Sequence, residues 1–185
     1  LMFDFEWTNK SLFNDAYKRN QSFYPNSDFQ ATGLPSSDEL TLLNPLKDNL
    51  PKELFTQSFS LPISNADGNI RTQLKQASKL LKEAGWVLKD QQLVHEKTGK
   101  VFEFEILMRQ AGIQRVLLPF IKNLERLGIT AIPRLIDTAQ YKVRLDQFDF
   151  DMTIVSLSQS HAPSYEQRDY FHSSTSMQEG SQNYA

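Results

Sequence analysis

The clearest pattern along the chain is the recurrence of apolar side chains at helical spacing in its last two thirds. Residues 74–84 carry such a stripe, and Gly85 follows at the place where a helix commonly ends on a left-handed residue. Residues 116–127 repeat the pattern, with Gly128 directly after them. We therefore predict two amphipathic helices, and the apolar face of each must pack against another apolar surface of the protein.

Short apolar runs with the length and composition of buried strands alternate with these helices. The runs cover residues 101–107, 129–136 and 151–157. Asp137 is a typical N-cap with Gln140 at the third helical position, and it predicts a further helix over residues 138–147. One more strand is expected at residues 88–94, joined to the first run through residues 96–99.

The order strand, helix, strand, helix, strand with short links indicates right-handed crossovers within one sheet. We therefore predict an α/β fold with a mixed, partly parallel sheet. The three strands that alternate with helices are expected to share that sheet, and the crossovers are the helices at residues 113–127 and 138–147. A structure with these strands in separate sheets would contradict the prediction.

The first third of the chain has a different character, because it is rich in aromatic side chains and is broken by proline and glycine. Apolar positions from Phe5 to Ala16 predict a first helix that ends near Asn20. Ser36 and Glu39 have the spacing of a capping box, which predicts a short helix after them.

The domain organisation follows from this contrast. We expect residues 1–70 to be a helical and extended lead-in to an α/β core of residues 71–185, with residues 1–185 forming a single lobe. The chain starts in mid-pattern without an initiator methionine and stops without a terminating element, so we expect it to be part of a longer protein. A signal peptide would then lie upstream.

Composition narrows the classes of function. With 20 Lys and Arg against 22 Asp and Glu, the formal net charge of -2 gives no overall positive field, so no nucleic-acid partner is expected. The 185 residues contain no cysteine, which excludes disulfides, thiol catalysis and cysteine-ligated zinc. No apolar run approaches the ~18 residues of a membrane span.

The predicted sheet also predicts where a ligand would bind. In open α/β sheets, ligands lie outside the carboxyl ends of the parallel strands, where backbone groups and helix amino-termini converge. This rule selects residues 108–112, 137–138 and 158–163. The third segment leads into residues 165–172, which are dense in hydrogen-bonding groups and aromatic rings. An ordinary polar surface loop is the alternative explanation of that stretch.

Several landmarks at these places resemble one known family. They are KLLKEAGW at residues 79–86, LGI at 127–129, QY at 140–141, FDFDM at 148–152, FDFEWTNK at 3–10, EQRDY at 166–170 and NY at 183–184. In order and spacing the chain resembles the extracellular solute-binding proteins of family 5, the oligopeptide and dipeptide receptors of ABC importers, and in particular their Yej-type branch. The similarity covers essentially the whole sequence.

The resemblance implies a periplasmic receptor of two lobes that closes on an extended peptide and delivers it to the permease subunits of an ABC transporter. This chain would be most of the carboxyl-terminal lobe, and the amino-terminal lobe would be missing. Many relatives bind the ligand's ammonium group with an aspartate that follows a tryptophan. Both are absent from the corresponding residues 157–160, and the resemblance suggests Asp169 as a substitute.

Other classes of function are weighed from the same residues. A small hydrolase using the segment from Ser160 to His172 is one alternative, but no Gly-x-Ser-x-Gly elbow presents the serine. His161 and His172 with Asp169 could ligate a metal, although the helical His-x-x-x-His spacing is lacking. A peptide-sensing domain without a transport role is another alternative, because a fold does not fix a function.

We therefore predict a binding module that is not an enzyme and needs no cofactor. Arg109 could pair with a ligand carboxylate in bidentate fashion, or it is an exposed arginine at a strand end. The residues expected to face the ligand are Arg109, Gln110, Ser158, Gln159, Ser160, His161, Arg168 and Asp169.

Overall fold

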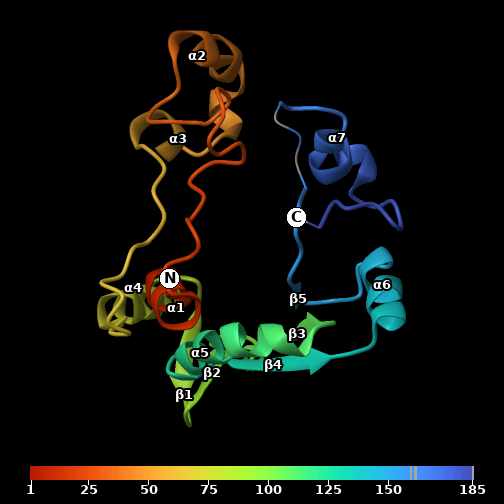
Figure 1. The fold of residues 1–185 in the computed structure, drawn as a ribbon. Helices are drawn as coiled ribbons and strands as arrows, with labels where there is room; N and C mark the ends of the chain where they lie inside the picture. The colour runs from red at the N-terminus through yellow and green to blue at the C-terminus, as the bar shows by residue number, and fades with distance from the viewer. Residues whose placement is uncertain (159, 161, 185) are drawn as a thin grey trace. The chain divides into compact units, whose positions relative to one another are not determined.

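The computed structural model describes residues 1–158, 160 and 162–184, and its chain divides into two compact units (Figure 1). Unit 1 comprises Leu1–Tyr17, Ile63–Ser158 and Tyr165–Ala185, and unit 2 comprises Lys18–Pro62 and Gln159–Ser164. Each unit is described by itself. That residues 1–185 form one lobe with a lead-in before residue 71 stays a prediction.

Unit 1 contains a three-stranded parallel sheet. Its strands are β3 (Glu103–Met108), β4 (Thr130–Leu135) and β5 (Met152–Thr153), in the order β4-β3-β5. The helices α5 (Gln114–Glu125) and α6 (Thr138–Asp146) connect them. The prediction that these three strands share one sheet, with two crossover helices, is confirmed, and the chain has the expected α/β fold.

The two helices cover opposite faces of the sheet. Ile106 and Leu107 are neighbours on β3, so their side chains point to opposite faces, and both are fully buried. Ile106 packs in the larger core cluster with three residues of α5, namely Leu117, Ile121 and Leu124. Leu107 packs in the smaller cluster with Tyr141 and Leu145 of α6. The sheet is therefore doubly wound around β3.

The strand β5 is shorter than predicted. Sequence analysis expects a strand over residues 151–157, but pairing with β3 stops after the two registers Ile106↔Met152 and Leu107↔Thr153. The following residues 154–158, which we call the exit segment, have no assigned strand or helix and are exposed. A strand's length depends on its partner, and here Met108 is the last residue of β3.

A separate hairpin replaces the single strand predicted at residues 88–94. The strands β1 (Trp86–Lys89) and β2 (Gln92–His95) are antiparallel, and the turn between them places Asp90 and Gln91 at φ 48° and 66°. Two successive positive φ values are typical of the two-residue hairpin turn. The single-strand prediction was wrong because such turns usually contain Gly or Asn, which this one lacks.

The turn between α5 and β4 anchors this hairpin. Gly128 has a φ of +79°, as expected of a residue that ends a helix in the left-handed region. Its carbonyl accepts a hydrogen bond of 2.7 Å from the backbone N–H of Leu93 in β2. β4 itself contains Pro133, which stands opposite Ile106 in the register with β3.

The remaining helices of unit 1 follow the predicted patterns with one correction. The helix α4 (Arg71–Glu83) ends before Gly85, as expected. The helix α1 (Phe5–Phe13) stops well short of the predicted end near Asn20, because Asn14 and Asp15 adopt left-handed φ values of 51° and 58°. The short helix α7 (Glu166–Phe171) lies in the carboxyl-terminal part of the unit and is followed by a single turn of 3₁₀-helix at Ser173–Thr175. Another single turn, Ala111–Ile113, precedes α5.

Unit 2 is built from short helices and irregular chain. The helix α2 (Ser37–Leu43) has the predicted capping box, since the Ser36 hydroxyl accepts from the backbone N–H of Glu39 and the Glu39 carboxylate accepts from that of Ser36. The 3₁₀-helix Asn44–Asn49 and α3 (Glu53–Thr56) follow. Among the described residues, no helix has the length and apolar character needed to cross a bilayer.

Candidate functional site

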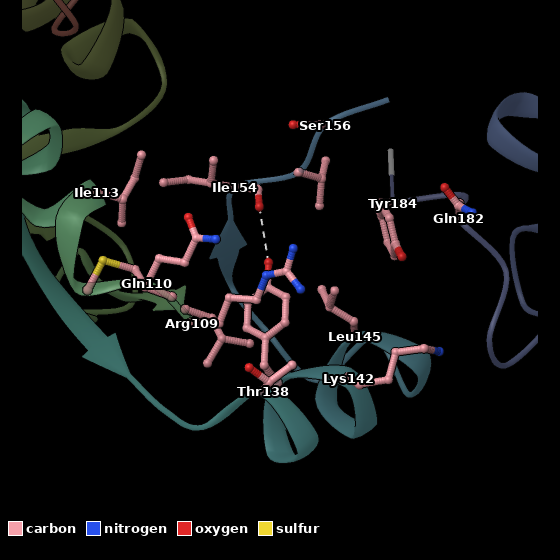
Figure 2. A pocket seen from close by; sticks show the side chains of 14 residues that line it. Arg109, Gln110, Ile113, Thr138, Lys142, Leu145, Ile154, Ser156, Gln182 and Tyr184 are labelled. Atoms are coloured by element: carbon pink, nitrogen blue, oxygen red, sulfur yellow. Dashed lines mark hydrogen bonds between the residues drawn. The ribbon is translucent and has the colours of Figure 1, made fainter. Parts of the chain in front are cut away.

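A cavity of about 550 Å³ opens in unit 1 where the strands β3 and β5 end (Figure 2). Its lining comes from the end of β3 and the following turn, from α6, from the exit segment and from the chain's last residues. The lining residues are Leu107, Met108, Arg109, Gln110, Ile113, Thr138, Tyr141, Lys142, Leu145, Ile154, Val155, Ser156, Gln182 and Tyr184.

The topology of the sheet explains why a cavity lies there. From β3 the chain crosses through α5 on one face to β4, and from β4 it returns through α6 on the other face to β5. The crossovers therefore reverse direction at β3, with β4 on one side of it and β5 on the other. Such a reversal of strand order is the position at which open α/β sheets bind their ligands.

Tyr141 is buried at the centre of this arrangement, with 6% of its surface exposed. Its hydroxyl lies 2.9 Å from Thr153 Oγ1 and donates to the carbonyl oxygen of Ile154 at 3.0 Å. The Thr153 hydroxyl donates to the Leu107 carbonyl oxygen at 3.2 Å. These contacts join α6 to the ends of β5 and β3, which are the two strands that border the cavity.

Two cationic side chains line the cavity, and they differ in their partners. Lys142 forms an ion pair with Asp146 one turn along α6, so its charge is largely neutralised. The guanidinium carbon of Arg109 lies 5.6 Å from the centre of the Tyr141 ring, a cation–π distance. Among the described residues, no carboxylate forms an ion pair with Arg109, and Figure 2 shows it between Gln110 and Tyr184. The cavity therefore carries a positive charge available to a ligand.

An aromatic group forms the wall of the cavity that lies across from Ile113 and Gln110 (Figure 2). The Tyr184 ring packs edge-on against Phe148 at 6.5 Å and against Phe150 at 6.1 Å. Burial raises the pKa of the Tyr184 hydroxyl above its ordinary value, and the negative charge of Asp146 raises it further. Tyr184 therefore stays protonated in neutral solution and can donate a hydrogen bond toward the cavity.

A charged cluster on the α6 face of the sheet holds that helix in place. Glu105 of β3 accepts from Arg134 of β4 and from Arg144 of α6, each at 2.8 Å, and Arg144 also pairs with Asp149 at 2.9 Å. The hydrogen bond from Arg134 is the main reason that the pKa of Glu105 is lowered, with Arg144 adding to it. Tyr141, which lines the cavity, thus sits on a helix that Arg144 ties to β3.

The structure brings only part of the predicted set of site residues to this cavity. Arg109 and Gln110 line it, as their position after β3 predicts. Ser158 lies in the exit segment beyond the lining, where its carbonyl oxygen accepts from the Tyr170 hydroxyl at 2.8 Å. Arg168 and Asp169 belong to α7 and are not among the lining residues.

The other predicted residues fall elsewhere. Ser160 belongs to unit 2, and its hydroxyl donates to the carbonyl oxygen of Ala162. Gln159 and His161 lie outside the described residues. Arg168 has its guanidinium carbon 6.0 Å from the Tyr165 ring centre.

Of the residue types of a catalytic triad, Ser160, His161 and Asp169, the histidine lies outside the described residues. Ser160 is in unit 2, whereas Asp169 and His172 are in unit 1. His172 Nδ1 instead lies 2.8 Å from the Ser174 hydroxyl and accepts from the Ser174 backbone N–H at 3.1 Å, so this imidazole caps a single helical turn. No group of three or more His, Asp or Glu within the described residues is arranged to hold a metal ion.

Sequence reasoning missed several residues of the cavity. Thr138 lies in one of the strand-end segments selected from the sequence, but no role was assigned to it. Tyr141 and Tyr184 occur in motifs that carry the family resemblance, and those motifs were the available signal. The apolar side chains of Ile154 and Val155 could not be assigned, since their orientation depends on where β5 ends.

Comparison with known proteins agrees with this architecture. The family model described as "Bacterial extracellular solute-binding proteins, family 5 Middle" matches residues 1–179. The protein YejA of Escherichia coli (strain K12) is 45% identical over 152 residues, which cover 82% of this chain and 25% of YejA. The probable peptide-binding protein YejA of Agrobacterium fabrum is 38% identical over 183 residues, which cover 99% of this chain and 30% of that protein.

A solved structure of an oligopeptide-binding protein has a similar fold. The oligopeptide-binding protein AppA from Bacillus subtilis, in complex with a nonapeptide, superposes with a TM-score of 0.51 at 26% identity, covering 74% of this chain and 25% of AppA. The chain thus spans about a quarter to a third of the length of the proteins it matches. Since the family model matches nearly all of its residues, the chain belongs to the bacterial extracellular solute-binding proteins of family 5.

Proposed function

We propose that this chain is the carboxyl-terminal, ligand-contacting lobe of a longer periplasmic receptor. The receptor holds a peptide in the cleft between this lobe and an amino-terminal lobe, and it delivers the peptide to the permease subunits of an ABC importer. The observation that carries the proposal is the cavity at the reversal of strand order, where an α/β sheet of this kind binds its ligand.

The comparisons support a peptide as the ligand. The Agrobacterium relative and the Bacillus structure reported above are both named as peptide-binding or oligopeptide-binding proteins. Their greater length supports a receptor in which the rest of the chain closes over this cavity. A ligand held between two lobes is buried from both sides, which is typical of small-molecule and peptide sites.

The lining of the cavity suits a peptide. Arg109 offers a guanidinium whose geometry matches a carboxylate, and Gln110 offers both an amide donor and an acceptor. Ile113 and Leu145 supply apolar surface for ligand side chains. Backbone groups at the strand ends can bond to an extended main chain without reading its sequence, so the receptor is expected to accept varied peptides.

The residues predicted from the sequence that lie beyond the lining form the rest of the proposed cleft face. They are Ser158, Gln159, Ser160, His161, Arg168 and Asp169. In this proposal Asp169 binds the ammonium group of the ligand. We also propose that the receptor carries out no reaction on the peptide, since its family is described as solute-binding and one relative as probably peptide-binding.

Calorimetry on two proteins tests the proposal. The full-length receptor and residues 1–185 alone are titrated with the same pool of short peptides. The full-length protein is expected to bind, and the isolated chain to bind far more weakly, because half of the cleft leaves much of the ligand in water. Equal dissociation constants, or no binding by the full-length protein, would contradict the proposal.

A further inference from the structure

The backbone alone holds the exit segment weakly. The strand β5 pairs with β3 at two registers only, Ile106↔Met152 and Leu107↔Thr153, and the exit segment begins at the next residue. Ile154, Val155 and Ser156 of this segment form one side of the cavity. Since the ladder ends before them, other bonds must direct their course.

The Tyr141 hydroxyl supplies such a bond. It donates to the Ile154 carbonyl oxygen at 3.0 Å, and this carbonyl belongs to the first residue after the ladder. The same hydroxyl lies 2.9 Å from Thr153 Oγ1, whose own proton goes to the Leu107 carbonyl oxygen at 3.2 Å. Two hydroxyl protons thus bond to two carbonyl oxygens, that of Leu107 in β3 and that of Ile154 directly after β5.

The ring of Tyr141 has a second contact on the same side of the sheet. The guanidinium carbon of Arg109 lies 5.6 Å from the ring centre, and Figure 2 shows the Arg109 side chain near the middle of the lining residues. Arg109 is exposed, so few other contacts restrict its long side chain. A cation over an aromatic face is held without losing the hydrogen bonds it can offer to a ligand.

We propose that Tyr141 is the positioning residue of the cavity: its hydroxyl fixes the start of the exit segment, and its ring supports Arg109. Tyr141 does this from a buried place on α6, a helix that the ion pair of Arg144 with Glu105 ties to β3. This inference rests on the proposed function, because it assumes that the cavity receives the peptide.

The chain offers a matched control for the test. Tyr170 is also 6% exposed, and its hydroxyl also donates to a carbonyl of the exit segment, that of Ser158 at 2.8 Å. Neither Tyr170 nor Ser158 lines the cavity, and Tyr170 bonds the backbone carbonyl of Ser158, so Tyr170→Phe leaves the Ser158 hydroxyl of the proposed cleft face in place. The variants Tyr141→Phe and Tyr170→Phe therefore lose the same chemical group from equally buried positions, one at the cavity and one beyond it.

Binding is measured in the full-length receptor with a pool of peptides of two to ten residues, by retention and mass spectrometry. Tyr141→Phe is expected to weaken the retained peptides about tenfold, and Tyr170→Phe less than twofold, although both variants lower the melting temperature similarly. Tyr141→Leu is expected to weaken binding further, because it also removes the ring beneath Arg109. Equal binding losses for the two Phe variants would show a merely structural role and overturn the inference.

A second measurement is independent of binding. In the full-length receptor with isotope-labelled isoleucine methyl groups, Tyr141→Phe is expected to shift the Ile154 signal and increase its mobility, whereas Tyr170→Phe leaves it unchanged. An unchanged Ile154 signal in Tyr141→Phe would overturn the positioning role. If the wild-type receptor retains no peptide, the proposed function fails, and the Ile154 signal still decides whether Tyr141 holds the exit segment.

Discussion

Gly128 allows a quantitative test of how the hairpin β1–β2 is held against the sheet. A Cβ atom added there would lie 2.5 Å from Leu88 Cδ1, 2.8 Å from the Leu93 backbone nitrogen and 3.1 Å from the Gln91 carbonyl oxygen. Leu88 is 64% exposed and its methyl group can move aside. The Leu93 nitrogen cannot, because it donates the 2.7 Å hydrogen bond to the Gly128 carbonyl oxygen.

The cost of Gly128→Ala has two parts. An alanine at φ +79° costs about 1 kcal/mol relative to glycine. Overpacking against the hairpin backbone adds about 2 kcal/mol. We therefore expect a total loss of about 3 kcal/mol in the free energy of unfolding, which is a large share of the ~5–15 kcal/mol that keeps a domain folded.

Gly99 provides the control, because it has a similar φ of +69° but nothing within 4 Å of the added Cβ. Gly99→Ala should therefore lose only the conformational part, about 1 kcal/mol. The assay is urea unfolding followed by tryptophan fluorescence in a Trp7→Phe background, which leaves Trp86 in β1 as the reporter. Adding Leu88→Ala to Gly128→Ala should recover only a little stability, since the backbone clash remains. Equal losses for the two alanine variants would refute the reasoning.

Three further predictions concern charge. The pKa of Glu105 is lower in the folded state than its unfolded-state value near 4.5, so its ion pairs stabilise the fold fully at pH values above 4.5. This contribution disappears as the pH falls through the lower folded-state pKa. Glu105→Gln should therefore lose about 1 kcal/mol at pH 7 and show a smaller loss of stability than wild type on acidification, as read from urea midpoints at both pH values. Arg109→Gln in the full-length receptor should weaken peptides with a free carboxyl end by about 2 kcal/mol and leave their amides nearly unchanged, measured by calorimetry. Asp169→Asn should weaken free-amine peptides by about 2–4 kcal/mol and spare amino-acetylated ones, and equal losses for both would assign the amine to another group.

The parts of the fold that could be predicted from the sequence are those controlled by local chemistry. Gly85 and Gly128 ended their helices because left-handed backbone suits glycine, and Asp137 began α6 because its carboxylate accepts from the N–H groups of Ala139 and Gln140. The alternation of these elements then determined the parallel sheet, and with it the position of Arg109 and Gln110.

Features that depend on distant contacts could not be predicted. The turn at Asp90 and Gln91 has no glycine, and it forms because the hairpin docks on Gly128. The cavity includes Tyr184, which joins Phe148 and Phe150 from the other end of the carboxyl-terminal region. Nothing in the local pattern around Tyr184 indicates that neighbourhood.

Pro133 has a consequence for how the sheet avoids unwanted association. In β4 the N–H groups of Thr130 and Ile136 donate to Phe102 and Met108 on the β3 side, so even-numbered residues point their N–H groups inward. Position 133 is odd-numbered and faces the outer edge of β4, where a proline has no N–H to give. A strand from another molecule that tried to extend the sheet there would lose a hydrogen bond in the middle of its pairing. Within the sheet of the described residues, the proline thus protects the outer edge of β4 from pairing with another molecule at no cost to the pairing with β3.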